Sequence, residues 1–350
     1  MAENRQILMI CERYRPAKGG VEKHVEKLVN ELVQEGFKID VLTSRHTHDL
    51  RSVERMDKHL IFRFPWRWDK NPFLSSLWVI KNRHRFRKYN IIHVHDTIPL
   101  LFWSLPFFVL KQRKQIFATF HGFERDPIPP IFKILRKIAR LIVYRVLCIG
   151  KFIERDYNVA CDSCSIGAVD IVPSSIQTRS GFVFIGRLEQ DTGILHSMEV
   201  LQELEENYGI RSHMTICGSG SQERLLREIS VRKGIDVQFR GWVENVHQYL
   251  EQGFVCLAGG LLSILESLAE GVPVIAYANT KLKRSYYQSV IDAGGNISIQ
   301  SDIKGIAKEF ARLSHDPDLY KRISMEGIKF ASTMTWSGLA SKYRSLWRVH

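Results

Sequence analysis

The sequence has no long hydrophobic segment. Its longest apolar stretch, residues 98–110, is interrupted by two prolines and a serine. A helix that spans a membrane needs about 20 consecutive apolar residues, so we expect no transmembrane helix. Residues 1–4 lead directly into a strand-like segment at 7–11, and we therefore also expect no signal peptide.

Cysteine is scarce, with six in 350 residues, most of them in or beside apolar segments. A small secreted protein held together by disulfides would contain more, so we expect reduced thiols and a cytoplasmic location. Cys161 and Cys164 form a single C-x-x-C pair. A zinc site would need a second pair and a redox site a thioredoxin-like context, so we interpret this pair as incidental.

Acidic residues are scarce in the first part of the chain. Residues 1–150 contain 28 Lys and Arg against 14 Asp and Glu, a net charge of +14, whereas residues 151–350 contain 22 and 23, a net charge of −1. This asymmetry predicts an anionic partner for the first part alone. With 45% hydrophobic residues, the chain is too apolar for intrinsic disorder and long enough for two domains.

Short apolar segments with strand character alternate with segments of helical period. One helix face is formed by apolar residues between Val21 and Val33, and Gly36 ends that helix. The expected strands are 7–11, 37–43, 91–95, 116–121, 146–149, 182–186, 214–217, 237–239, 254–257 and 273–277. This alternation predicts an α/β fold with parallel sheets in two doubly wound domains that face each other across a cleft.

The stretch 169–181 is rich in serine and has no apolar period, which is typical of a linker. We therefore expect domains at residues 1–172 and 173–334. In open α/β sheets ligands bind beyond the carboxyl ends of the strands, so the loops after the strands are where functional residues are expected.

Two of these loops contain glycine beside a strand end or a helix start. Gly19 and Gly20 precede the first helix, where free N–H groups suit a phosphate, although an ordinary turn explains them equally well. Gly186 and Arg187 end a strand, and the arginine is placed to bind a phosphate or to form a surface salt bridge.

The segment 261–275 reads as a loop, a short helix that Gly271 ends, and a strand. The start of this helix is suited to an anion. Ser263 and Glu266 have the spacing of a capping box, and Glu266 is equally suited to a ribose. The residues alone leave these alternatives open.

Taken together, six motifs resemble those of the family 4 glycosyltransferases, in the same order and over essentially the whole chain. They are PAKGGVEKHV at 16–25, HVHD at 93–96, TFHGFE at 119–124, FIGRLEQDTG at 184–193, ICGSG at 216–220 and LLSILESLAEGVPVIA at 261–276. The resemblance implies the GT-B fold, with two Rossmann-like domains, and a retaining reaction. The second domain would bind a nucleotide-sugar donor and the first the acceptor, and a final helix at 335–350 would pack back on the first domain.

The resemblance also implies roles for individual residues. His121 would be the active-site histidine, Arg187 the diphosphate-binding arginine and Glu266 the ribose-binding glutamate. The residues expected at the donor are Gly19, Gly20, Gly186, Arg187, Gly218, Ser263, Ile264, Leu265 and Glu266, with backbone amides of Ser263, Ile264 and Leu265 at the phosphates.

The sequence departs from the family pattern at two positions. Ala258 stands where the family has the first glutamate of its E-x7-E motif, and Thr192 stands where it has a lysine. These departures indicate either that the donor sugar is recognised differently or that activity is weak.

We therefore predict a metal-independent glycosyltransferase of the hexosyltransferase type with no cofactor. It would use a UDP- or GDP-linked sugar and a lipid-linked or surface glycan as acceptor. Asp316 and Asp318 read as a turn and helix cap. His93 and His95, together with Asp96, could suggest a metal, but no cysteine or further ligand lies at a suitable spacing, so we expect no metal site. The alternatives are a nucleotide-sugar epimerase of the same fold and a non-catalytic basic binding protein.

Basic clusters interleaved with aromatic residues predict an anionic surface as a partner. The clusters lie at 83–88, at 111–114 and among Lys133, Arg136, Lys137 and Arg140, and the nearby aromatic residues include Trp66, Trp68 and Trp103. Nucleic acid would produce the same charge pattern. We favour an anionic membrane because the enzyme-like motifs occupy the strand-end loops, and we expect peripheral attachment at the inner face of the plasma membrane.

Overall fold

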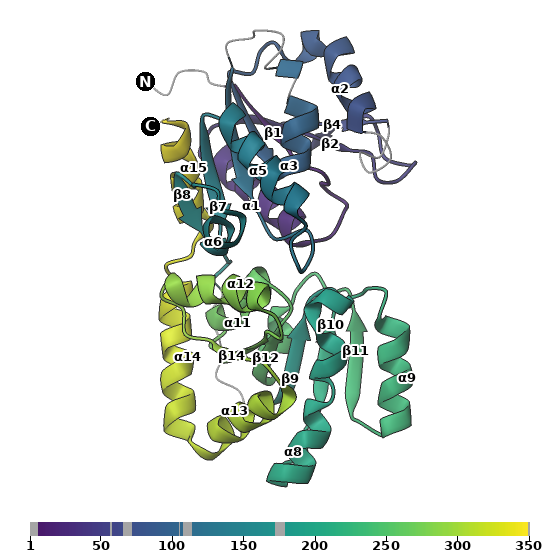
Figure 1. The fold of residues 1–350 in the computed structure, drawn as a ribbon, viewed down its shortest axis with the longest axis vertical. Helices are drawn as coiled ribbons and strands as arrows, with labels where there is room; N and C mark the ends of the chain where they lie inside the picture. Colours follow the sequence, from purple (N-terminus) through teal and green to yellow (C-terminus); the bar gives the residue numbers. More distant parts are fainter. Residues whose placement is uncertain are drawn as a thin grey trace. The chain divides into compact units, whose positions relative to one another are not determined.

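The structure is a computed structural model that describes residues 6–56, 58–65, 72–104, 106–107, 114–171 and 179–348. The chain divides into two compact units. The first unit comprises Met1–Ser165 together with Trp336–His350, and the second comprises Ile166–Thr335 (Figure 1). The boundary lies a few residues before the expected one at 172, and residues 172–178 of the expected linker lie outside the described residues.

The first unit is built on an eight-stranded sheet in the order β3-β4-β2-β1-β5-β6-β7-β8, which is parallel except where β3 meets β4. The strands are β1 Gln6–Ile10, β2 Lys38–Ser44, β3 Val53–Met56, β4 His59–Phe64, β5 Ile91–His95, β6 Gln115–Phe120, β7 Arg145–Ile149 and β8 Ser163–Ser165. The helices are α1 Gly20–Gln34, α2 Pro72–Lys81, α3 Thr97–Pro99, α5 Pro130–Ile142, α6 Phe152–Tyr157 and α15 Trp336–Trp347, with short helical turns η1 Arg83–Phe86 and η2 Leu100–Ser104.

The second unit contains a six-stranded parallel sheet in the order β11-β10-β9-β12-β13-β14. The strands are β9 Ser180–Ile185, β10 Met214–Cys217, β11 Val237–Gly241, β12 Gly253–Ala258, β13 Val274–Tyr277 and β14 Ser298–Gln300. The helices are η3 Gln190–Thr192, α7 Ile194–Ser197, α8 Val200–Tyr208, α9 Glu223–Lys233, α10 His247–Leu250, α11 Leu261–Ala269, α12 Lys281–Asp292, α13 Ile303–His315 and α14 Pro317–Ala331.

In each sheet the order of strands reverses at one point, between β1 and β5 in the first unit and between β9 and β12 in the second. A doubly wound sheet opens a crevice at this switch point, beyond the carboxyl ends of the two strands. The expected glycine and arginine loops follow β1 and β9, so the topology places them at the switch points.

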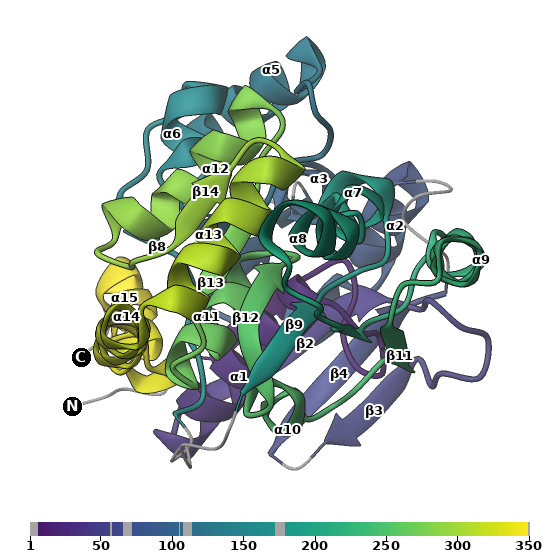
Figure 2. The same cartoon turned by 90° about the horizontal axis from the view of Figure 1, so that it is seen from below.

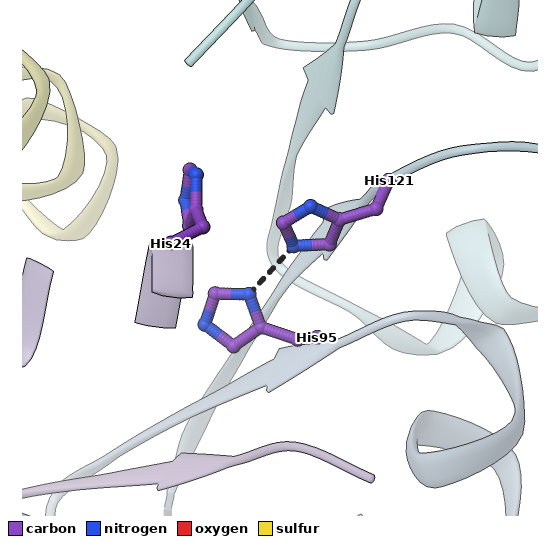
Figure 3. A group of neighbouring side chains, drawn as sticks. All are labelled: His24, His95 and His121. Atoms are coloured by element: carbon purple, nitrogen blue, oxygen red, sulfur yellow. Dashed lines mark hydrogen bonds between the residues drawn. The ribbon is translucent and has the colours of Figure 1, made fainter. Parts of the chain in front are cut away.

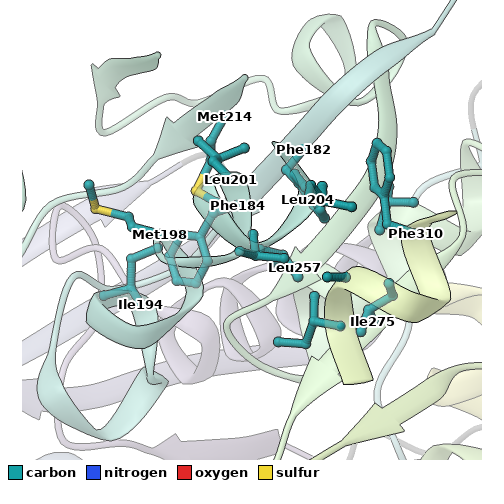
Figure 4. Close-up of a cluster of buried hydrophobic side chains, with 14 of the residues drawn as sticks. Phe182, Phe184, Ile194, Met198, Leu201, Leu204, Met214, Leu257, Ile275 and Phe310 are labelled. Atoms are coloured by element: carbon teal, nitrogen blue, oxygen red, sulfur yellow. The ribbon is translucent and has the colours of Figure 1, made fainter. Parts of the chain in front are cut away.

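The core of the second unit forms where the central strands meet helices on one face of the sheet. Phe182 and Phe184 of β9 and Leu257 of β12 are buried against residues of α8 and α13 (Figure 4). Helices α8 and α13 run side by side over this face (Figure 2). Strands buried on both faces are almost continuously apolar, which is why the sequence predicts them well.

The last helix, α15, belongs to the first unit and packs against α1. Its buried side chains recur at helical spacing, from Trp336 through Leu339 and Tyr343 to Trp347. One stripe of this helix is therefore part of the core of the first unit.

Two of the cysteines form a disulfide that the sequence analysis did not predict. Cys148 of β7 forms a disulfide with Cys161, so the expectation of reduced thiols is wrong for this pair, whereas Cys164 is free. The two cysteines are close because β7 and the segment before β8 run side by side, a proximity that spacing in the sequence does not reveal.

Among the described residues, no helix is both long enough and apolar enough to cross a membrane.

The β9 and β12 loops approach each other so closely that only glycine fits. A Cβ on Gly259 would lie 2.6 Å from the carbonyl oxygen of Ile185 and 2.9 Å from Cα of Gly186. Both are backbone atoms of the neighbouring loop, which cannot move aside cheaply. This close approach leaves the switch point of the second unit lined by backbone.

We predict that Gly259→Ala destabilises the second unit by about 1–3 kcal/mol, because the added methyl group pushes two loops apart. Urea unfolding monitored by circular dichroism measures the change. Gly122→Ala is the matched control, since a Cβ there meets nothing within 4 Å. Equal stability of the two variants would contradict the close packing of the loops.

Candidate functional site

Three buried histidines from different elements meet in the first unit. His95 ends β5, His121 directly follows β6, and His24 lies on α1. Because β5 and β6 are parallel neighbours, their carboxyl ends lie at the same edge of the sheet, and His95 and His121 face each other there (Figure 3). The structure thus places His121, the expected active-site histidine, in a cluster rather than alone.

The rings contact one another directly. His95 Nδ1 and His121 Nε2 are 2.9 Å apart and share a hydrogen bond, and the ring of His24 packs edge-on against that of His121 with centroids 4.9 Å apart. The backbone N–H of His121 donates to Asp96 Oδ1 at 2.8 Å. Asp96 has a positive φ of 68°, a conformation that a side chain usually avoids, so the surrounding contacts hold this turn in place.

A chain of hydrogen bonds connects this cluster to helix α15. Trp347 Nε1 donates to His93 Nδ1 at 2.9 Å, and His93 Nε2 lies 2.8 Å from Thr119 Oγ1. Thr119 Oγ1 is 2.9 Å from the Tyr343 hydroxyl, which is 3.0 Å from His24 Nε2. An indole N–H can only donate, so a neutral His93 accepts at Nδ1, and its proton on Nε2 is donated to Thr119.

The four histidines of this network are held in the neutral form. Burial lowers the pKa of His24, His93 and His95 well below the usual value, and for each of them neighbouring histidines add to the effect. Burial, with a contribution from the charge of Arg136, lowers the pKa of His121 to about 3. Burial also raises the pKa of Asp96. The site in the first unit therefore offers neutral imidazoles near pH 7.

The cluster of His24, His95 and His121 has the composition of a metal site, with one ligand nitrogen from each ring and all three within 4.8 Å of one another. Neutral imidazole is the form that binds a metal. Three ring nitrogens are already engaged, His95 Nδ1 with His121 Nε2 and His24 Nε2 with the Tyr343 hydroxyl, whereas the buried Nε2 of His95 has no hydrogen-bond partner among the described residues. The sequence analysis weighed His93 and His95 and did not identify His24, although His24 lies on the buried face of an amphipathic helix, which was the available signal.

The glycine loop of the first unit lies where the sequence predicts it. Gly19 precedes α1 and Gly20 is its first residue, and Lys23 N donates to the Gly19 carbonyl at 3.0 Å. The first-turn N–H groups of such a helix have no partner in a preceding turn. Gly19 and Gly20 thus lie beside the β1 end of the switch point, next to the histidine-bearing helix.

In the second unit, Gly186, Gly218 and Arg187 lie at the carboxyl ends of neighbouring strands. A Cβ on Gly218 would collide with the Gly186 carbonyl, so these loops are also in close contact. Arg187 forms an ion pair with Asp191 at 2.7 Å, and its side chain is 64% exposed. An exposed pair of this kind contributes little stability, which leaves the guanidinium available to a ligand.

The observed start of helix α11 contradicts two of the expectations for the motif at 261–276. The helix begins at Leu261, and the Ser263 hydroxyl accepts from Gly260 N at 3.1 Å and donates to Gly260 O at 2.9 Å. Ser263 is therefore not the residue that starts the helix, and the capping-box interpretation of Ser263 with Glu266 is wrong. Glu266 lies in the middle of the helix and is only 5% exposed.

The backbone amides that were expected at the phosphates also lie further inside the helix than the sequence predicts. Ile264 N donates to the Gly260 carbonyl within the first turn, and Leu265 lies further inside the helix. The N–H groups that point out of the helix start are those of residues 261–263. Of these, Leu261 N donates to the Tyr286 hydroxyl at 3.2 Å.

Helix α12 contributes residues that the sequence analysis missed. The Tyr287 hydroxyl donates to the Ala258 carbonyl at 3.2 Å, and burial raises the pKa of Tyr286, an effect that the nearby charge of Arg187 opposes. Lys283 is buried, and its Nζ lies 3.6 Å from the position that a Cβ on Gly193 would occupy. The available signal was that α12 follows the carboxyl end of β13, at the edge where ligands bind.

Two positions noted in the sequence have ordinary structural contacts. Thr192 is buried, and its hydroxyl donates to the Glu189 carbonyl at 2.7 Å. Asp316 starts α14, and its Oδ1 accepts from Leu319 N at 2.9 Å, which confirms the interpretation of Asp316 and Asp318 as a turn and helix cap.

Comparison with protein families gives two matches that together span most of the chain. The model of Glycosyltransferase Family 4 matches residues 18–162, and that of Glycosyl transferases group 1 matches residues 173–330. Among curated proteins, the chain is similar to a GalNAc-α-(1→4)-GalNAc-α-(1→3)-diNAcBac-PP-undecaprenol α-1,4-N-acetyl-D-galactosaminyltransferase from Campylobacter jejuni. The identity is 24% over 186 residues, and the match covers 49% of this chain and about half the length (49%) of that relative.

Solved structures share the fold over nearly the whole chain. Sucrose-phosphate synthase from Thermosynechococcus elongatus has a TM-score of 0.77 at 17% identity and covers 98% of each chain. Anabaena HepE, solved with UDP and glucose, has a TM-score of 0.77 at 13% identity, with 98% of this chain and 99% of that chain covered. The pneumococcal O-GlcNAc transferase GtfA, solved with UDP and GlcNAc, has a TM-score of 0.70 at 12% identity and covers 99% of both. These likenesses confirm the expected α/β fold with two Rossmann-like domains.

We predict that the first unit loses stability steeply as the pH falls below about 6.5. Unfolded histidines take up protons there while the buried ones stay neutral, so the unfolded state binds more protons and is favoured. Each of the four contributes about 2 kcal/mol between pH 7 and pH 5. Hydrogen exchange of the β5 and β6 amides measures the loss.

The test uses His24→Gln, which should flatten this pH dependence because one titrating ring is removed. The exposed His84→Gln is the matched control and should leave the slope as in the wild type. A slope that does not change in His24→Gln would show that this ring is protonated in the folded state.

Proposed function

The chain belongs to family 4 of the glycosyltransferases and has the GT-B fold, and on that basis we propose that it transfers a hexose from a nucleotide-diphosphate sugar to a hydroxyl acceptor with retention of configuration. The observation that carries the proposal is the backbone-lined switch point of the second unit, with Arg187 and the start of α11 beside it. Backbone N–H groups and an arginine form a typical site for a diphosphate.

The reaction requires that negative charge on the departing diphosphate be stabilised as it develops. The bond between the anomeric carbon and the diphosphate oxygen breaks, the acceptor oxygen bonds to that carbon, and the acceptor proton leaves with the diphosphate. In our proposal, Arg187 and the N–H groups of residues 262 and 263 bind the diphosphate, and Glu266 binds the ribose. The position of Glu266 inside α11, without a capping role, supports this assignment.

Lys283 supplies the second positive charge in this proposal. Family members have a lysine at the position of Thr192, but Thr192 here is buried and bonded to its own loop. Nζ of Lys283 lies close to Gly193, the next residue, so α12 brings an ammonium group to the same loop from another direction. We propose that this group replaces the missing lysine, which explains how the chain tolerates threonine at 192.

His121 acts at the donor sugar as a neutral hydrogen-bonding group in this proposal. Its low pKa excludes a role as a cationic acid near pH 7. Gly19 and Gly20 lie beside α1, where their backbone is suited to the donor phosphate. No divalent ion is required, because Arg187, Lys283 and the helix start supply the charge that a metal would provide.

The acceptor in our proposal is a lipid-linked or surface glycan at the inner face of the plasma membrane. The printed name of the Campylobacter relative includes an undecaprenol-linked acceptor, and the first part of this chain is strongly basic. UDP occurs with both HepE and GtfA in their structures, so UDP-linked sugars are the first donors to test, with GDP-linked sugars next.

We predict that Arg187→Ala, Glu266→Ala and Lys283→Met each weaken donor binding by about 1.5–3 kcal/mol, the contribution of a hydrogen bond to a charged group. Isothermal titration with UDP- and GDP-linked sugars measures the affinity, and release of free nucleotide measures turnover. Interconversion of sugars without an acceptor would instead identify an epimerase, and the absence of both binding and turnover would identify a binding protein.

Matched controls separate binding from folding. Arg224→Ala removes an exposed arginine that pairs with Glu228 in the same i,i+4 arrangement as Arg187 and Asp191, and Lys281→Met removes an exposed lysine from the same helix as Lys283. Both should bind donor as the wild type does. A lower melting temperature with unchanged donor affinity would assign a purely structural role to the residue concerned.

We also predict that turnover continues in excess EDTA. The proposed diphosphate site uses side-chain and backbone donors and therefore needs no divalent ion. Loss of turnover in EDTA that Mn²⁺ or Mg²⁺ restores would overturn the metal-independent mechanism. If Zn²⁺ alone restored turnover in the wild type but did not restore it in His24→Gln, the histidine cluster would be identified as a metal site.

A further inference from the structure

Helix α5 of the first unit exposes a continuous apolar stripe. Ile131, Ile134, Ile138 and Leu141 recur at helical spacing and all face solvent, with 53% of Ile134 and 84% of Leu141 exposed. Exposure of about half or more of four large aliphatic side chains on one helix face is costly in water, and such stripes mark interaction surfaces.

The orientation of this helix is fixed from its opposite side. Arg136 is buried and donates to the Gly122 carbonyl at 2.8 Å and to Glu124 Oε1 at 3.0 Å, and its guanidinium stacks 3.8 Å from the ring centre of Tyr157. Ala139 is buried beside it. With Arg136 and Ala139 holding one face inward, the aliphatic stripe remains on the outside.

The stripe is bordered by positive charge. Lys133 and Lys137 are exposed, and Arg140 is half-buried and paired with Asp162 at 3.2 Å, while the sequence of α5 contains no acidic residue. A helix with an apolar stripe and a lysine-rich border is the pattern of a segment that lies in the interface of an anionic bilayer.

A second helix shows that exposed apolar side chains alone do not produce this pattern of an apolar stripe with a basic border. Helix α9 also exposes Leu225 and Val231, the latter to 84%, but it carries Glu223 and Glu228 among its basic residues. It has four basic residues against these two acidic ones, a net charge of +2 against +4 for α5, and both carboxylates pair with arginines of the same helix. An anionic surface would therefore gain less from α9 than from α5. This helix provides matched control positions for α5.

We propose that α5 docks on the anionic surface of a lipid bilayer, with Ile134, Ile138 and Leu141 inserted among the headgroups and Lys133 and Lys137 against the anionic lipids. The lysines of this helix belong to one of the three basic clusters that the sequence indicates, but the apolar residues beside them are aliphatic rather than aromatic. Trp103, one of the aromatic residues expected near such a surface, is fully buried, so that part of the expectation is wrong. Trp66, Trp68 and residues 111–113 lie outside the described residues.

The other basic positions are less suited to such docking. Lys114 donates to the backbone carbonyl of Tyr89 at 2.7 Å as well as to that of Phe86, and burial lowers its pKa to about 8. Arg83, Arg85 and Arg87 are exposed, but the residue between them, Phe86, is buried. The segment 83–88 exposes no apolar side chain of its own, and the exposed Phe73, Leu77 and Ile80 belong to the preceding helix α2, whereas α5 carries both charge and an apolar stripe on one helix.

The role that we assign to docking through α5 rests on the proposed function, because that role is to bring a lipid-linked acceptor to the first unit. The helix follows β6 through the loop that begins with His121 and Gly122, and Arg136 of α5 holds the carbonyl of Gly122. A bilayer bound at α5 therefore lies one short loop away from His121. This arrangement brings a lipid-linked acceptor to the first unit without a membrane-spanning segment.

The experiment is sedimentation of the full chain with vesicles of phosphatidylcholine alone or of phosphatidylcholine mixed with phosphatidylglycerol. Binding should require phosphatidylglycerol and weaken as salt is added. Lys133→Ser with Lys137→Ser should lower the partition coefficient on the mixed vesicles by about thirtyfold, or about fivefold for each lysine. Ile134→Ser with Leu141→Ser should lower it at least as much, and the loss should persist at high salt because it is apolar in origin.

Leu225→Ser with Val231→Ser in α9 is the matched control and should bind vesicles as the wild type does. All variants should keep the wild-type melting temperature and the wild-type rate of donor hydrolysis without vesicles, because the substituted side chains are exposed. Hydrolysis without vesicle binding would overturn the docking proposal alone, and vesicle binding without donor binding would overturn the proposed function alone.

Three further outcomes would overturn docking on an anionic membrane. Equal binding to both kinds of vesicle would exclude the role of the lysines. Salt-sensitive binding to RNA in place of vesicles would assign the basic surface to nucleic acid. A dimer in sedimentation velocity that Leu141→Ser converts to a monomer, without vesicle binding, would assign the stripe to a second copy of the chain.

Discussion

The buried hydrogen-bond chain from Trp347 to His24 is the constraint on which the site of the first unit depends. Polar groups removed from water must be paired, and this chain pairs groups of α15, β5, β6 and α1 in one sequence of contacts. The last helix of the chain thereby determines which nitrogen of His93 carries a proton and fixes the ring of His24 against His121. A change in α15 would therefore act on the site even though α15 contains none of the expected site residues.

Apolar burial explains most of which strands the sequence predicts, although the buried strand β4 was also missed. Central strands such as β5 and β10 are found at their expected bounds because burial on both faces makes them continuously apolar. The edge strands β3, β8 and β14 are short and only partly buried, and the sequence analysis missed them for that reason. Apolar residues recur at helical spacing from residue 194 to residue 204, but the segment is divided between α7 and α8, a break that the apolar spacing does not reveal.

Prediction of the site was limited in a different way. Positions adjacent to a strand end, such as His121 and Arg187, are identified by sequence because the topology of a doubly wound sheet determines where they lie. His24 and Lys283 lie on helices, and they reach the site through packing between segments distant in sequence. The Cys148–Cys161 disulfide was missed for the same reason. The capping-box interpretation placed the start of α11 three residues too late, because Gly260 rather than Ser263 precedes the helix.

Each unit has its own pattern of charge, and in our proposal each pattern suits a different charge that develops during the reaction. In glycosyl transfer the anomeric carbon gains positive charge while the diphosphate gains negative charge. A protonated histidine beside that carbon would raise the energy of the transition state, and burial together with the charge of Arg136 keeps His121 neutral. The cations near the strand ends of the second unit, Arg187 and Lys283, are placed for the diphosphate. A divalent ion would serve the same purpose as these two side chains, which is why our proposal for the diphosphate includes no metal.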